Sequence, residues 1–359
     1  METSPGPSRR LLRIAPALCL LLLIAGCAEN YPQTTLLPRG DFGRMVDSLF
    51  RTTVFWAAIV FVLVEGALLF AIFKFRGRPD DPEPRQVHGH TGLEVVWTII
   101  PAFILVMIAV PTIKTIFRTS DYASGDVITV EVIGHQWWWE FRYPDLGIVT
   151  ANEFRVPVDR TINLRMTSAD LIHSFWVPQF AGKRDVLPGR HNPLWFKAEV
   201  TGSFNGQCAE FCGVQHARMS FVLHVDSAAA FEAWVANERV GSPLVNSGRV
   251  VRDTTGPRDA AADSLERAGQ AAFTAGGCLG CHAMVGTPLA GTTSLKGPNL
   301  SHVGSRTTIV AGMLQNTPDN LARWLSNPDS VKPGVLMILP RKLTSGEIAT
   351  LVAYLRSHR

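Results

Sequence analysis

The residues of this 359-residue chain whose types and spacing could support chemistry gather first in one short segment. Cys208, Cys212, His216 and Met219 lie close together there, and His173 stands upstream. Two thiols, two imidazoles and one thioether are ligand types that suit copper. The segment therefore predicts a soft metal site.

Three other interpretations of this segment are possible. A disulfide between Cys208 and Cys212 would suit an oxidising compartment, but it leaves His216 and Met219 without a role. A tetrahedral zinc site needs only four ligands and gains nothing from methionine. A single blue copper uses one cysteine, and here there are two. Two copper ions bridged by both thiolates would use all five side chains.

A second chemical motif follows further along the chain. Cys278 and Cys281 are separated by two residues and followed directly by His282, which is the signature of covalent c-type haem attachment. The main alternative is a redox-active dithiol. The helical character of the sequence before the motif and the predicted export of the chain favour haem.

The sixth ligand of such a haem must come from a later residue, and the methionines 284, 313 and 337 are the candidates. Met284 is too close to His282 to reach the opposite face of the porphyrin. Met337 precedes a predicted amphipathic helix over residues 347–358, and Met313 stays open as the other candidate. Ligation by histidine and methionine closes the iron coordination, which favours electron transfer over oxygen binding.

Three uninterrupted apolar runs indicate how these motifs are positioned. The run at 14–25 follows several arginines and is too short to cross a bilayer, so residues 1–27 are predicted as a signal peptide. Residues 24–27 resemble a bacterial lipoprotein processing site, so Cys27 is expected to carry lipid; the alternative is an ordinary signal peptide that ends near a cysteine. The runs at 54–73 and 95–113 are each long enough for a transmembrane helix.

Charge around the two spans predicts their orientation. The loop between them begins with Lys74, Arg76 and Arg78, so the positive-inside rule places it in the cytoplasm and the rest of the chain outside. Glu65 is the only charge in the first span, where it either serves a function or bonds to a partner subunit. Neither span contains histidine, so a membrane-embedded haem must belong to another subunit.

The remaining sequence suggests two external domains. Alternating, β-branched segments at 127–133, 154–158, 161–166 and 220–225 predict an antiparallel sandwich or barrel. The net charge of +4 is too small to indicate nucleic-acid binding. The expected divisions are a signal peptide (1–27), an external segment (28–50), a two-helix transmembrane hairpin (51–118), an all-β domain (119–230), a linker (231–262) and an all-α domain (263–359).

The copper-type segment, residues 171–178 and the preceding hairpin resemble subunit II of haem-copper cytochrome c oxidases. The resemblance runs from about Leu49 to Val225. It implies a cupredoxin fold for the all-β domain and a binuclear copper A centre. The implied ligands are His173, Cys208, the carbonyl oxygen of Glu210, Cys212, His216 and Met219. The Glu210 side chain is also expected to help bind magnesium or manganese at the interface with subunit I.

Similar motifs imply roles for other residues. Trp137, within residues 134–140, corresponds to a tryptophan near the electron-entry surface, although three adjacent tryptophans could also be simple packing. Glu94 matches a carboxylate at the mouth of a proton-uptake path in subunit II relatives. The alternative is that Glu94 only stabilises the N-terminus of a helix. The C-terminal domain resembles class I cytochromes c, in which residues 297–300 would support His282 and Met337 would bind iron.

The expected function is therefore that of a haem c-fused subunit II of a caa3-type oxidase in the bacterial inner membrane. It would pass electrons from cytochrome c through haem c and copper A to haem a of subunit I, for oxygen reduction coupled to proton pumping, with subunit III as a further partner. A copper A nitric oxide reductase is the main alternative, and a copper carrier or assembly factor explains fewer features. His88, His90, His191 and His224 are expected to be solvated loop residues.

Overall fold

The computed structural model describes residues 32–77, 86, 88–239, 260–284 and 296–359. The predicted signal peptide and Cys27 lie outside these residues. The described chain forms two compact units, of which one is Arg44–Asp121 and the other contains everything else. Each is described by itself below.

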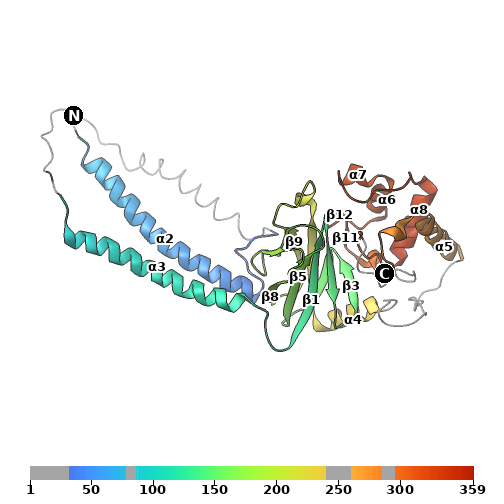
Figure 1. Cartoon of the computed structure of the whole chain (residues 1–359), viewed down its shortest axis with the longest axis horizontal. Helices are drawn as coiled ribbons and strands as arrows, with labels where there is room; N and C mark the ends of the chain where they lie inside the picture. Colours follow the sequence, from blue (N-terminus) through green and yellow to red (C-terminus); the bar gives the residue numbers. More distant parts are fainter. Residues whose placement is uncertain (1–31, 78–85, 87, 240–259, 285–295) are drawn as a thin grey trace, which may run out of the picture. The chain divides into compact units, whose positions relative to one another are not determined.

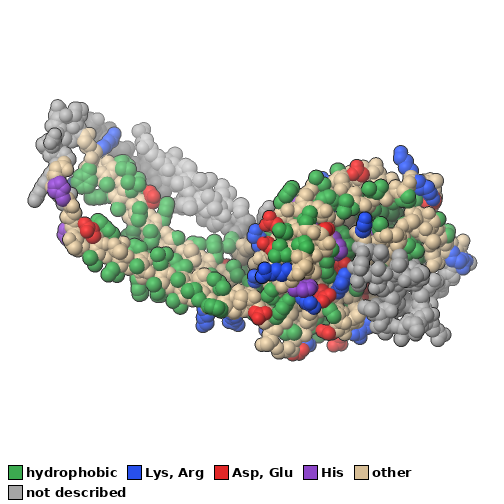
Figure 2. All heavy atoms as spheres, in the orientation of Figure 1, with side chains coloured by type: hydrophobic (Ala, Val, Ile, Leu, Met, Phe, Trp, Pro, Cys, Tyr) green, Lys and Arg blue, Asp and Glu red, His purple; other side chains and the backbone are tan. Residues whose placement is uncertain are grey.

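Two long helices form the first unit, α2 (Asp41–Lys74) and α3 (Thr91–Thr119) (Figure 1). Both predicted spans lie inside them, and Pro101 and Pro111 are accommodated within α3. Their apolar side chains are exposed along the whole length, and Figure 2 shows these side chains covering both helices. A helix that is apolar on all sides is typical of a membrane span, so the predicted hairpin is confirmed.

The all-β domain is a sandwich of two five-stranded sheets (Figure 1). In sheet order, the first sheet contains β3 (Ile148–Ala151), β2 (Trp138–Tyr143), β1 (Val127–His135), β5 (Thr161–Ser168) and β8 (Asn192–Lys197). The second contains β4 (Glu153–Pro157), β10 (Ser220–Asp226), β9 (Gly202–Cys208), β6 (His173–Trp176) and β7 (Arg184–Val186).

The expectation of a purely antiparallel sandwich is wrong for two strand pairs. Strand β1 pairs with β5 in parallel, and β10 pairs with β4 in parallel. The chain crosses to the second sheet at β4 and returns to the first at β5, so β5 reaches β1 by a crossover rather than a hairpin. Side-chain alternation reveals which face of a strand is buried but not the direction of its neighbour.

An aromatic cluster fills the space between the sheets. Phe141 of the first sheet stacks on Phe154 of the second with ring centroids 4.3 Å apart, and Phe175 stacks on Phe221 at 4.6 Å. Full burial of each such ring contributes about 1.5–3 kcal/mol. A Cβ at Gly206 would lie 2.1 Å from the Phe221 ring, so strand β9 has glycine where this ring crosses it.

The C-terminal domain is mainly helical. Its helices are α5 (Ala260–Ala275), α6 (Pro318–Ser326), α7 (Pro328–Val331) and α8 (Ser345–Ser357), with a short ribbon of β11 (Thr308–Ile309) and β12 (Leu314–Gln315). Helix α8 confirms the predicted closing helix and begins with a capping box between Thr344 and Glu347. Helix α4 (Ala228–Arg239) packs on the sandwich, where its Trp234 contacts Tyr143 of β2. This helix covers the first residues of the segment predicted as a linker.

Candidate metal centre and haem cavity

His173 is the first residue of β6, and its side chain is 0% exposed. Its Nε2 lies 2.8 Å from the Asp170 carboxylate, while its Nδ1 lies 3.9 Å from the Sγ of Cys208. A Cβ at Gly134 would lie 2.8 Å from the imidazole ring, so this glycine leaves room for it. Asp170 and Gly134 together hold the ring with Nδ1 toward the thiol.

The other predicted ligands lie at or within the loop of residues 209–219, here called the copper loop, which joins the antiparallel neighbours β9 and β10. The Sγ atoms of Cys208 and Cys212 are 3.8 Å apart, and the Sγ of Cys208 lies 3.2 Å from the Glu210 carbonyl oxygen. Cys212 also lies 3.7 Å from Nδ1 of His216 and 3.8 Å from Sδ of Met219. The fold thus brings all six predicted donor atoms into one continuous set.

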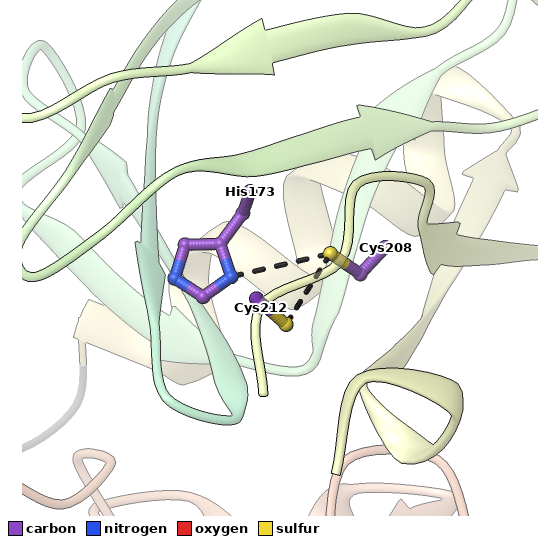
Figure 3. Close-up of side chains that lie close together, drawn as sticks. All are labelled: His173, Cys208 and Cys212. Carbon is purple, nitrogen blue, oxygen red and sulfur yellow. Dashed lines mark hydrogen bonds between the residues drawn. The ribbon is translucent and has the colours of Figure 1, made fainter. Parts of the chain in front are cut away.

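The two thiols are close enough to share a cation and are not joined to each other. His173, Cys208 and Cys212 bring one ligand atom each to within 4.8 Å of one another, and Figure 3 shows these three side chains converging. The hydrogen bond from Cys212 lowers the pKa of Cys208, and the resulting thiolate raises the pKa of Cys212. The negative charge of one thiolate disfavours ionisation of the other thiol, so bound cations are needed to stabilise both cysteines as thiolates. The donor set of thiolates, imidazoles and a thioether is chemically suited to copper.

Trp137 supports the copper loop from β2's N-terminal side. Its Nε1 donates to the Cys212 carbonyl oxygen at 2.8 Å, and Nε2 of Gln136 donates to the same oxygen at 2.9 Å. Gly213 has φ of +111°, and a Cβ there would lie 3.0 Å from the Trp137 ring. The loop therefore turns directly against the indole.

The haem-attachment motif borders a cavity of about 220 Å³, here called the haem cavity. Cys278, Cys281, His282 and Met337 line it, and Trp137 lines it from the β domain. Of the three candidate methionines, all in the described chain, only Met337 is among the lining residues.

His282 is oriented by its own surroundings. Its Nδ1 donates to the carbonyl oxygen of Pro298 at 2.8 Å, which leaves Nε2 available as a ligand. Burial lowers the pKa of His282 and so favours the neutral, ligating imidazole. A Cβ at Gly297 would lie 2.6 Å from the ring. Two thiols, this imidazole and the Met337 thioether around one apolar cavity fit a covalent haem.

The remaining predicted site residue, Glu94, lies in the first turn of α3. Its side chain is exposed and accepts a hydrogen bond from the backbone N–H of His90 at 3.3 Å. His90 in turn caps the helix by accepting from Leu93. This arrangement accounts for a helix-stabilising role of Glu94.

Sequence reasoning missed Asp170 and Gln136. Asp170 lies three residues before His173, and Gln136 is adjacent to Trp137, but these spacings alone are common in loops. The expectation that His224 is a solvated loop residue is wrong. It is buried on β10, where Nε2 lies 3.2 Å from Glu153 and Nδ1 lies 2.8 Å from the Ser203 hydroxyl.

Sequence comparison identifies relatives that match almost the whole chain. Cytochrome c oxidase subunit 2 of Alkalihalophilus pseudofirmus is 34% identical over 96% of this chain and 96% of its own length. The chain belongs to the cytochrome c oxidase subunit 2 family. A second subunit 2, from Bacillus sp. strain PS3, is 33% identical over 94% of both chains.

Family models for subunit 2 divide the chain as the fold does. Residues 43–115 match the transmembrane domain of cytochrome c oxidase subunit II, residues 147–226 match its periplasmic domain, and residues 266–359 match cytochrome c. The solved periplasmic domain of subunit II from Bradyrhizobium japonicum is 38% identical, covering 33% of this chain and 96% of that one with a TM-score of 0.32. This subunit 2 is therefore a membrane protein and the electron-entry subunit of an oxidase complex.

Proposed function

We propose that this subunit 2 relays electrons from a cytochrome c donor to subunit I of a caa3-type oxidase, which reduces oxygen to water and pumps protons. When bound, haem c and copper A supply the one-electron carriers of this relay. One observation carries the proposal: Trp137 lines the haem cavity and also donates a hydrogen bond to the backbone of Cys212. The Trp137 side chain thus connects the two candidate cofactor sites, and the neighbouring Gln136 makes the same pair of contacts.

In this proposal the chain's own residues bind and orient the two groups. Cys278 and Cys281 would attach the haem, and His282 and Met337 would bind its iron. The copper pair is held by His173, Cys208, the Glu210 carbonyl, Cys212, His216 and Met219. The Asp170–His173 and His282–Pro298 hydrogen bonds keep the ligating nitrogens fixed, so few atoms need to move when charge changes.

The finer assignments are proposals of the same kind. We propose that the chain sits in the bacterial inner membrane with both external domains on the periplasmic face, and that Cys27 carries lipid after removal of the signal peptide. Subunit III completes the complex. The exposed side chain of Glu210 helps bind magnesium or manganese at the subunit I interface, and Glu94 serves proton uptake.

The proposal is tested on the native complex, purified with subunit I. Its optical spectrum and its copper and iron content are measured, together with oxygen uptake driven by reduced cytochrome c. Covalent haem c, a haem a-type signal, two coppers bound by this chain and cytochrome-dependent oxygen uptake are expected. A complex with haem c that lacks haem a-type absorption and consumes no oxygen would contradict the oxidase assignment.

A further inference from the structure

Glu153, the first residue of β4, is 6% exposed, and its carboxylate is contacted mainly by the C-terminal domain. The backbone N–H and hydroxyl of Thr308 donate to it at 2.6 and 2.7 Å, and those of Thr307 donate at 3.0 and 2.7 Å. The buried His224 lies 3.2 Å away on the other side. Four donors from one domain therefore converge on one carboxylate of the other.

This carboxylate is ionised despite its burial. Burial opposes ionisation, but the hydrogen bonds from His224, Thr308 and Thr307 lower the pKa of Glu153 to about 2. A hydrogen bond to a charged group is roughly twice as strong as one between neutral groups. The contact is thus built for a carboxylate and is not a passing surface interaction.

A second buried group makes the reverse connection. Lys332 of the C-terminal domain is 2% exposed, and its Nζ donates to the carbonyl oxygens of Trp137 at 2.9 Å and Arg218 at 2.8 Å. Lys332 and Thr308 both line the haem cavity. Glu153 and Lys332 are thus buried ionisable side chains that bond to the opposite domain, and both contacts border the cavity.

Transient redox partners meet through solvated charges at the rim of their interface. Here the ionisable groups are buried and hydrogen-bonded across the contact, which fixes one orientation. Thr308 and Lys332, which make these contacts, also line the haem cavity. Lys332 bonds to the backbone of Trp137, and the Trp137 side chain bonds to the backbone of Cys212. The two anchors therefore set the spacing between the haem cavity and the copper loop.

We infer that Glu153 is a positioning residue that keeps the C-terminal domain docked on the all-β domain, with Lys332 as the second anchor. The C-terminal domain, which carries the haem site, then does not swing between an electron donor and the copper site. This rests on the proposed function. The step it serves moves one electron from the haem domain, which is oxidised, to the copper domain, which is reduced, and transfers no atom.

The test compares Glu153→Gln and Thr308→Val with wild type in the complete oxidase. In Glu153→Gln the side-chain amide keeps only one acceptor oxygen, and its NH₂ group faces the threonine donors. Thr308→Val removes a single hydroxyl donor and keeps the size and shape of the side chain. Glu131→Gln, on the partly exposed ion pair with Arg165, is the matched control. The measurements are the rate of internal electron transfer after rapid haem reduction and the haem–copper distance distribution from paramagnetic relaxation.

We expect Glu153→Gln to broaden the distance distribution and slow internal transfer several-fold, because electron tunnelling weakens steeply as the two centres move apart. Thr308→Val should show a smaller change in the same direction, and Glu131→Gln should match wild type. If both interface variants keep the wild-type distances and rate, the inference is wrong. Absence of the haem c or copper signals in wild type would instead defeat the proposed function.

Discussion

The indole Nε1 of Trp137 lies 2.8 Å from the carbonyl oxygen of Cys212 and donates a hydrogen bond to it. The same side chain lines the haem cavity. Of the three consecutive tryptophans, Trp137 therefore combines a contact with the copper loop and a place in the cavity wall. Trp139 lies in the aromatic core, with its ring 5.5 Å from that of Phe221, and donates to the Met219 carbonyl oxygen at 3.4 Å, but it is not among the residues that line the cavity.

Trp137→Phe is expected to slow electron transfer between haem and copper while leaving the copper ligands in place. The loss of this hydrogen bond should also lower stability by about 1 kcal/mol. Flash-induced electron transfer in the purified oxidase measures the first effect. Trp234→Phe, on α4 beside Tyr143, is the control. Equal rates in the two variants would show that Trp137 only fills space.

Asp170→Asn should weaken copper binding, because the carboxylate that orients His173 and favours its donation from Nδ1 is lost. Substitutions of groups that orient a metal ligand typically reduce affinity by roughly 10- to 100-fold. Competition with a chelator, followed by copper analysis and visible absorption, measures this change. Asp185→Asn on the exposed side of β7 should behave as wild type. Full copper retention by Asp170→Asn would contradict the predicted role.

Met337→Ala should abolish the sulfur-to-iron charge-transfer band of the oxidised haem and lower its reduction potential, because the thioether ligand is lost. Met313→Ala should keep both properties, since Met313 is not among the residues that line the cavity. Absorption spectroscopy and a redox titration distinguish the two variants. The opposite pattern would assign the sixth ligand to Met313.

Acid should weaken the Glu153 anchor. The pKa of Glu153 is about 2 in the fold and 4.5 without partners, so its contribution is complete above about pH 4.5 and is lost as the pH falls toward 2. The full contribution is on the order of 3 kcal/mol. The thermal midpoint of the complex, measured between about pH 5 and pH 3, should fall more steeply in wild type than in Glu153→Gln. If the thermal midpoints of wild type and Glu153→Gln fall in parallel with pH, Glu153 does not contribute to the loss of stability in acid.

The sequence was most informative for sites whose residues are close together along the chain and for elements that have a continuous apolar composition. Cys208 to Met219 lie close together at the end of β9 and in the copper loop, and the attachment motif ends in its own ligand, so both could be identified from spacing. The apolar runs likewise predicted α2 and α3. The parallel pairing of β1 with β5 was not predictable, because a strand's alternation carries no information about its neighbour's direction.

Contacts between distant residues were also beyond the sequence. Glu153 and Thr308 are 155 positions apart, and Lys332 and Trp137 are 195 apart. Glutamate and lysine are usually solvated, so nothing in their local pattern indicated burial. His224 was misjudged for the same reason: its partner Glu153 comes from a parallel strand 71 positions away.

The burial of Lys332 and Glu153 has a consequence for how the subunit responds to ionic strength. Dissolved ions screen exposed charges over about 8–10 Å, but they act weakly on groups that water does not reach. An encounter with an external donor should therefore slow as salt is added, whereas transfer inside the chain should keep its rate. The two halves of electron entry can thus be separated experimentally by adding salt.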